Sequence, residues 1–366
     1  MKRGAHADFT LFLVSMLLLC GGLVMIYSAS AIWADQNLRG DTFYFVKRQL
    51  VWAAIGFCAM AFFSRLNYNR LKEWTWPIMV LTAMALTAAL FGPPIKGVRR
   101  WIHLGPVGLQ PSEFAKLACA LFLAHYLDRK HSRLDSPVRG FLIPGGVISF
   151  FLLLIGLGPD LGTPILIFSV ALLVIFIAGG PLRWLGGSLL AAVPVVVFEI
   201  LRSPYRRARL ATFLSPWEDA HGKGYQVVQS LLAVGSGGWF GKGLGAGQLK
   251  LLYLPTPHTD FIFPVLCEEL GLAGALFFLG LYGTILIRGL KIARSAPNLF
   301  GSLLAAGITL TLTLQAFFNI AMSIGLLPTK GIPLPFLSFG GSSLLSSMIG
   351  IGVLMNISRE AARHQR

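Results

Sequence analysis

Long apolar stretches recur along the whole chain, and short clusters of charged residues separate them. A helix needs about 20 mostly apolar residues to cross the hydrocarbon core of a bilayer. The sequence therefore predicts an all-α integral membrane protein of about ten transmembrane helices, built as a single polytopic domain over residues 1–366. The ten stretches are residues 10–33, 49–64, 74–92, 112–127, 140–159, 161–179, 182–201, 259–287, 298–323 and 335–357.

Composition excludes several other classes of protein. Charged residues make up 13% of the chain, against about 25% in soluble domains, so neither a soluble nor a disordered chain is predicted. The net charge is +16, but the basic residues punctuate apolar stretches instead of gathering on one folded face, so nucleic-acid binding is not predicted. The first apolar stretch is longer than the core of a signal peptide and is expected to stay as an anchor.

Basic residues in the short loops predict the orientation. More than twice as many Lys and Arg residues fall on the side of the N-terminus as on the other side. Because cytoplasmic loops carry this excess, both termini are predicted to be cytoplasmic. The longest interruption, residues 202–258 between the seventh and eighth spans, then faces the extracytoplasmic side. Its apolar and aromatic residues indicate an ordered loop with an interfacial helix.

A glycine-rich stretch, residues 235–247, lies within this loop. It is no Walker motif, because Gly241-Lys242 is followed by Gly243 instead of Ser or Thr. A tight loop with close backbone packing is the favoured interpretation. The alternative is that its backbone N–H groups and Lys242 cradle a pyrophosphate.

Asp260 is the most telling acidic residue, since it follows the long outer loop and precedes a strongly apolar helix. The helix N-terminus favours the charged carboxylate, whereas partial burial opposes it. Such a carboxylate could abstract a proton from a substrate hydroxyl. The alternative is a structural role as the N-cap of the helix.

Other ionisable residues lie in or beside predicted spans, where charges are costly and usually functional. Glu113 and Lys116 are three residues apart, so they share a helix face and could pair. At least one of Glu268 and Glu269 should point into the bundle and pair with Lys116 or an arginine. Apart from these side chains, the span interiors are interpreted as apolar.

Basic residues near the outer ends of the spans suit a phosphorylated lipid, because arginine forms bidentate contacts with phosphate. These basic residues are Arg99, Arg100, Arg206, Arg207 and Lys242.

The segment 328–343 is dense in Pro, Gly and Ser, and irregular backbone near membrane depth is tolerated only where protein or water covers it. We expect this segment to line a cavity, with a plain connecting loop as the alternative.

Five short blocks, in order from about residue 100 to residue 345, carry a resemblance to a known family. They are Arg100-Trp101 with Gln110-Pro111-Ser112-Glu113 and Lys116, Pro159-Asp160-Leu161-Gly162-Thr163, Gly224-Tyr225-Gln226 with Gln229-Ser230 and Gly235-Ser236-Gly237-Gly238, His258-Thr259-Asp260-Phe261-Ile262-Phe263 with Glu268-Glu269-Leu270-Gly271, and Leu334-Pro335-Phe336-Leu337-Ser338-Phe339-Gly340-Gly341-Ser342. Together they resemble the SEDS family of bacterial cell-wall synthesis, which contains FtsW and RodA. Phe339 departs from the family, which commonly carries Tyr there.

The resemblance implies a peptidoglycan glycosyltransferase in the bacterial cytoplasmic membrane. It would polymerise lipid II into β-1,4-linked glycan at the outer face, with a class B penicillin-binding protein as its partner, alongside other division or elongation proteins and membrane lipids. Asp260 would be the catalytic residue. The resemblance and the outer charges together give the candidate substrate-binding residues Arg99, Arg100, Trp101, Glu113, Lys116, Asp160, Arg206, Arg207, Lys242, His258, Ser338 and Ser342.

Several alternatives stay open at this point. The blocks Pro328-Thr329-Lys330 and Pro216-Trp217-Glu218-Asp219 resemble the division branch, typified by FtsW, more than the elongation branch, typified by RodA. A lipid II flippase would use the same cavity and cations, and a scaffold would only recruit a transpeptidase. A divalent cation, Mg²⁺ or Mn²⁺, could assist the reaction, although no convincing cluster of metal ligands is visible.

Overall fold

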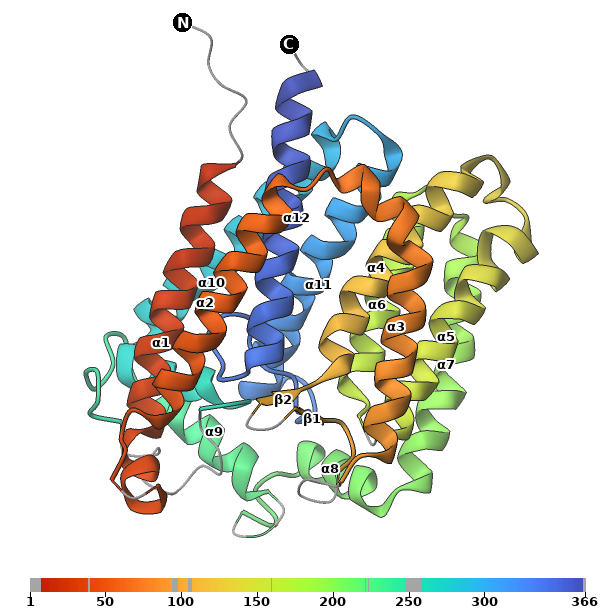
Figure 1. The fold of residues 1–366 in the computed structure, drawn as a ribbon. Coiled ribbons are helices and arrows are strands. Elements are labelled where there is room, and N and C mark those ends of the chain that lie inside the picture. Colours follow the sequence, from red (N-terminus) through yellow and green to blue (C-terminus); the bar gives the residue numbers. More distant parts are fainter. Residues whose placement is uncertain are drawn as a thin grey trace, which may run out of the picture.

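The structure is a bundle of long helices, which Figure 1 shows as a ribbon. This computed structural model describes residues 8–38, 40–93, 98–104, 107–158, 160–220, 222, 224–247 and 258–364. The α-helices are α1 (Phe9–Asn37), α2 (Tyr44–Arg65), α3 (Leu71–Phe91), α4 (Pro111–Lys130), α5 (Ile143–Leu157), α6 (Gly162–Ile177), α7 (Leu182–Arg202), α8 (Pro204–Leu214), α9 (Tyr225–Ser236), α10 (Ile262–Ser295), α11 (Leu299–Ser323) and α12 (Gly341–His364).

Each of the ten predicted spans corresponds to one of these helices, which confirms the helical membrane fold. Among the described residues, eight helices are long and apolar enough to cross a membrane. The other two predicted spans are α4, which carries Glu113, Lys116 and Asp128, and α6, which has 16 residues. The full number of crossings therefore stays a prediction.

The bounds differ from the prediction where glycine and proline interrupt the apolar pattern. The last span was expected from residue 335, but α12 begins at Gly341. Phe336 has a φ of 66°, which no helix accommodates. A short antiparallel pair of strands, β1 (Ile102–Leu104) and β2 (Val107–Leu109), was not predicted.

The long interruption after the seventh span is ordered where the structure describes it. It contains α8 and α9, in agreement with the prediction of an ordered loop with a helix, while residues 248–257 lie outside the described residues. Figure 1 places α8, α9 and the two strands at the end opposite to the start of α1 and the end of α12. The two ends of the chain thus share one side of the bundle, as predicted, and which side is cytoplasmic stays a prediction.

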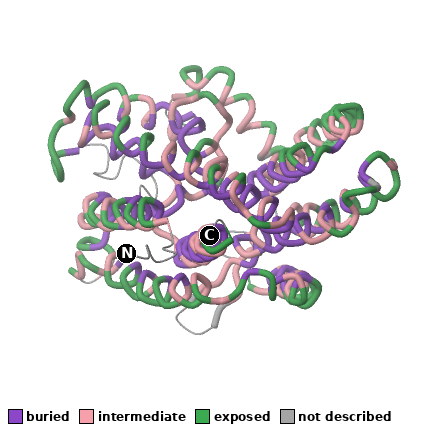
Figure 2. Tube along the Cα trace, turned by 90° about the horizontal axis from the view of Figure 1, so that it is seen from above, coloured by how far each residue is buried: buried purple, intermediate pink, exposed green. Residues whose placement is uncertain are grey.

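Burial is highest in the helices α4, α11 and α12. Seen along the helices in Figure 2, α12 runs through the middle of the molecule. It packs closely on α2, because a Cβ at Gly352 would lie 2.6 Å from the carbonyl oxygen of Met60. By contrast α7, described throughout its length, has no buried residue. The centre of the bundle is therefore protein, and α7 is left to contact lipid.

Helix α10 is broken near its first residues at Gly271, which has a φ of +67°. The amides of Leu272 and Ala273 donate to the carbonyl oxygens of Gly238 and Trp239 at 2.9 and 3.0 Å. A Cβ at Gly271 would lie 2.3 Å from the amide nitrogen of Gly241. Glycine is required by both the backbone conformation and the close approach. The glycine-rich loop therefore locks onto the break in α10.

Candidate active site

Asp260 lies in the turn directly before α10 and is partly buried. Phe261 is the N-cap residue of that helix, and Asp260 directly precedes it. The backbone carbonyl of Asp260 accepts a hydrogen bond of 2.9 Å from Nδ2 of Asn319 on α11. A buried helix therefore holds the turn that carries this carboxylate.

Gly331 marks the space in front of the Asp260 carboxylate. A Cβ built on this exposed glycine would lie 3.3 Å from Oδ2 of Asp260 and 4.0 Å from Nη1 of Arg100. A carboxylate and a guanidinium thus face the same glycine. A negative and a positive side chain are therefore placed next to one exposed position.

Arg100 is held in place by the segment that joins α5 to α6. Its Nε donates to the carbonyl oxygen of Gly158 at 2.6 Å, and its Nη1 lies 3.9 Å from Oδ2 of Asp160. Asp160 is buried and accepts hydrogen bonds from the amides of Gly162 and Thr163 at the start of α6. Aspartate is well suited to satisfy free N–H groups at a helix start, so Asp160 is fixed and in turn orients Arg100.

Lys330 also lies beside Asp160, although the sequence did not place it among the candidate site residues. The Cβ of Lys330 lies 3.3 Å from the position that a Cβ would take at Gly162, so Lys330 packs against the start of α6. Desolvation by burial lowers the pKa of Lys330 to about 8, and the nearby Asp160 carboxylate opposes this shift. On the other side, Nη1 of Arg209 donates to the carbonyl oxygen of Thr329 at 2.9 Å. A cation inside a Pro- and Gly-rich loop was the signal that could have identified Lys330.

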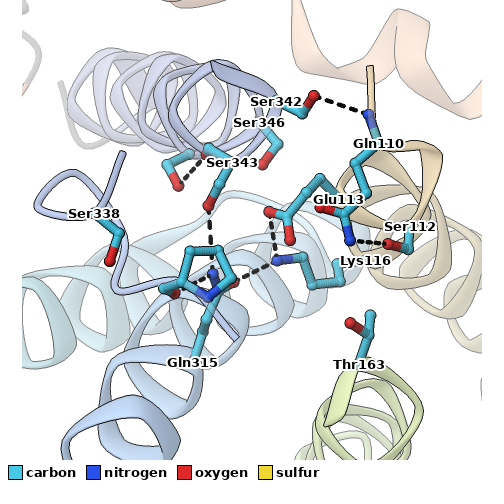
Figure 3. Close-up of polar contacts among 12 residues, drawn as sticks. Gln110, Ser112, Glu113, Lys116, Thr163, Gln315, Ser338, Ser342, Ser343 and Ser346 are labelled. Atoms are coloured by element: carbon cyan, nitrogen blue, oxygen red, sulfur yellow. Dashed lines mark hydrogen bonds and ion pairs between the residues drawn. The ribbon is translucent and has the colours of Figure 1, made fainter. Parts of the chain in front are cut away.

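A second polar group is buried behind this site, between α4 and α11 (Figure 3). Lys116 Nζ lies 2.8 Å from Oε2 of Glu113 and also donates to Oε1 of Gln315. Gln315 Nε2 donates to the carbonyl oxygen of Pro333 at 2.8 Å. The predicted Glu113–Lys116 pair is confirmed. Since Lys116 is buried and paired, it is no free cation on the outer surface.

The two predicted serines accept hydrogen bonds from backbone amides, one in the loop before α12 and one directly before α4. Ser338 Oγ accepts from the amide of Leu334 at 2.8 Å, and Ser342 Oγ accepts from the amide of Gln110 at 2.9 Å. Both serines are buried. Residues 334–338 of the irregular loop are buried in protein, which is the condition expected for such backbone at membrane depth.

Two predicted site residues are aromatic or pack among aromatic rings. His258 is buried, with ring centroids 4.2 Å from Phe45 and 5.8 Å from Phe339. Trp101 lies over Gly108 of β2, whose Cβ would be 3.3 Å from the indole. Phe339 thus fills its place with an apolar contact to His258.

The remaining predicted cations are distributed over separate contacts. Lys242 Nζ lies 2.8 Å from Oε1 of the buried Glu268, a partner that the sequence did not suggest. Arg206 forms an ion pair with Glu199. Arg207 is exposed on α8, and Arg99 is exposed with Nη1 3.4 Å from the carbonyl oxygen of Leu90.

The glycine-rich loop uses its N–H groups on α10. The amides of Lys242 and Gly243 donate to the carbonyl oxygens of Glu268 and Glu269, both at 3.0 Å. The amide of Gly245 donates to the Glu269 carboxylate at 3.1 Å. These bonds support the tight-loop interpretation over a phosphate cradle.

No group of three or more His, Cys, Asp or Glu side chains is placed to hold a metal ion in the described part of the chain.

Comparison with known proteins decides the family. Residues 8–363 match the cell cycle protein family of FtsW, RodA and SpoVE. The chain belongs to this family. It is 43% identical over 355 residues to stage V sporulation protein E of Bacillus subtilis, covering 96% of this chain and 97% of that protein. It is 40% identical over 359 residues to the probable peptidoglycan glycosyltransferase FtsW of Trichlorobacter lovleyi, covering 97% and 94% of the two chains.

Solved structures show the same fold. A chain of a peptidoglycan synthase complex that coordinates polymerization and crosslinking superposes with a TM-score of 0.80, at 29% identity, and the match covers 97% of this chain and 98% of that one. The rod shape determining protein RodA of Thermus thermophilus gives a TM-score of 0.71 at 27% identity, with 97% of both chains covered. The family resemblance stated from the sequence is confirmed.

Proposed function

We propose that this chain is a peptidoglycan glycosyltransferase that joins lipid II units into β-1,4-linked glycan strands. Family relatives of nearly the same length are named probable peptidoglycan glycosyltransferase FtsW. The observation that carries the proposal is the placement of Asp260 and Arg100 around the open position at Gly331.

In the proposed reaction Asp260 takes the proton of the 4-hydroxyl of the acceptor sugar. That oxygen attacks the anomeric carbon of the donor, the bond to undecaprenyl pyrophosphate breaks, and the configuration inverts from α to β. The proton on Asp260 then passes to solvent. A positioned base of this kind contributes roughly 10²–10⁴-fold to a rate.

The departing pyrophosphate gains negative charge, which fixed cations stabilise. Arg100 and Lys330 are the best candidates, because both lie beside Asp160 next to the Asp260 turn. Lys116, Arg206 and Lys242 are occupied by acidic partners of their own. A divalent cation, Mg²⁺ or Mn²⁺, would accompany the pyrophosphate oxygens of the substrate, and a chelator added to the assay tests that need.

The setting of the reaction follows from the same family. The protein would act at the outer face of the bacterial cytoplasmic membrane, with both termini cytoplasmic, and a class B penicillin-binding protein would be the partner that cross-links the product. The charged groups around Gly331 come from the end of the bundle that carries α8 and α9 (Figure 1), which favours surface chemistry over transport across the bilayer. A lipid-translocation assay separates the two.

The cellular process is septal synthesis in division, as several FtsW relatives at about 40% identity indicate. The similarity to a stage V sporulation protein supports a second candidate, a polymerase used in spore formation. Depletion distinguishes them: loss of septa in growing cells supports the division role, whereas normal growth with defective spores supports the other.

The direct test is polymerisation of lipid II by the purified protein with a candidate transpeptidase. Asp260→Asn is expected to lower turnover by about 10³-fold, as for loss of a general base. Asp41→Asn is the matched control, because Asp41 pairs with Lys47 on the surface at 3.0 Å, and it should act like the wild type. Sustained polymerisation by Asp260→Asn would remove the assignment.

A further inference from the structure

Asn319 is a fully buried side chain on α11 that joins two segments of the active site. Its Nδ2 donates to the carbonyl oxygens of Asp260 and Ile332, at 2.9 and 2.7 Å. Because both partners are acceptors, the amide nitrogen must face them; the reversed amide would set three oxygens against one another. One side chain thus ties the Asp260 turn to the residue that follows Gly331.

Gln315 supports the same loop from the preceding turn of α11. Residues four apart lie on one face of a helix, and Gln315 Nε2 donates to the carbonyl oxygen of Pro333 at 2.8 Å. Two successive turns therefore hold the adjacent carbonyls of Ile332 and Pro333. Since α11 is among the most buried helices, these amides attach the loop to a rigid base.

We infer that Asn319 is a positioning residue of the reaction, which sets the distance between the Asp260 carboxylate and the segment of Lys330 and Gly331. The inference rests on the proposed function. Asn319 bonds only to the backbone of Asp260, so it orients that residue without using its carboxylate. A misplacement of about 1 Å in such a site can cost roughly 100-fold in rate.

The test is Asn319→Leu, which keeps a similar volume and removes both donated hydrogen bonds. Polymerisation by the complex with its transpeptidase is measured per folded molecule across pH. We expect kcat to fall about 10–100-fold, with the KM for lipid II changed less than about threefold, since uniform binding is retained. The acid limb of the kcat profile should move to higher pH, because the carboxylate moves away from the Arg100 guanidinium. Asn319→Gln, which keeps the amide, should recover part of the rate.

Thr309→Val is the matched control, since it removes a buried hydrogen bond on the same helix, from Thr309 Oγ1 to the carbonyl oxygen of Ala305 at 2.7 Å. It should retain the wild-type kcat and pH profile. If Asn319→Leu fails to fold, Asn319→Ser, which keeps one donor, is measured in the same way. A folded variant with wild-type kcat and an unmoved acid limb would leave Asn319 a purely structural role. If the wild type polymerises lipid II in that case, only this inference fails; if the wild-type complex does not polymerise lipid II, the proposed function itself fails.

Discussion

Arg100 and Asp260 belong to distant segments of the chain, yet both side chains face Gly331. Arg100 follows the end of α3 in the sequence, and Asp260 lies in the turn directly before α10. Gly331, which has no side chain, is exposed next to both groups. This relationship makes Gly331 a sensitive position for the proposed chemistry.

Gly331→Ala should place a methyl group 3.3 Å from Oδ2 of Asp260 and so crowd the acceptor hydroxyl. We expect a loss in kcat/KM of about 10–100-fold with normal accumulation of the protein, because Gly331 is exposed. Gly280→Ala is the control, since a Cβ there meets nothing within 4 Å. Equal polymerisation rates for the two variants would contradict the assignment of this space to substrate.

Lys330 should give the reaction an alkaline limb. Its pKa is lowered to about 8, chiefly by desolvation, so the ammonium loses its proton as pH rises through that value and the pyrophosphate loses a cation. We expect kcat/KM, which reports the free enzyme, to fall above about pH 8. Lys330→Arg stays charged and should lose this limb, whereas Lys330→Met should be slow and flat over the same range. A limb that persists in Lys330→Arg would belong to another group.

Lys116→Met should destabilise the protein, because it leaves the Glu113 carboxylate buried beside an apolar side chain. Breaking a buried ion pair in this way typically costs about 3–5 kcal/mol. Thermal unfolding in one fixed detergent measures the loss. The double variant Glu113→Gln with Lys116→Met removes both charges and should recover most of the stability. If Lys116→Met alone unfolds like the wild type, the pair contributes little to the fold.

The predicted orientation can be tested with single cysteines in a background that lacks the four native ones. Ser215→Cys follows α8 and should react with an impermeant maleimide in intact cells. Ser295→Cys ends α10 on the opposite side and should react only after the membrane is opened. The reverse pattern would place both termini outside the cytoplasm.

The sequence predicted the helices well because a bilayer demands long apolar segments, and each of these survives as a helix. It predicted their bounds less well where backbone geometry decides, as at Phe336 with its positive φ. The strands β1 and β2 are three residues each, too short for any alternating pattern to emerge. They pair with Ile102 opposite Leu109.

Part of the candidate site could be predicted from the sequence because several of its residues are charged. Asp260, Arg100 and Asp160 stood out as polar residues at the ends of apolar stretches, and the structure brings them to one end of the bundle. Gln315 and Asn319 were missed because the span interiors were interpreted as apolar, and neutral amides carry no charge to mark them. Their spacing of four residues in an otherwise apolar helix was the available signal.

Helix α7 has no buried residue along its described length and contacts the bundle through few neighbours. Other described helices of this chain therefore cover little of its surface. In a micelle the detergent replaces the lipid next to that surface, so the tilt of α7 will follow the chain length of the amphiphile. Helix α8 continues directly from α7, and its Arg209 holds Thr329 beside Lys330. A change in the tilt of α7 is therefore expected to move the loop that carries Lys330, so that rates measured in two detergents report two positions of that loop.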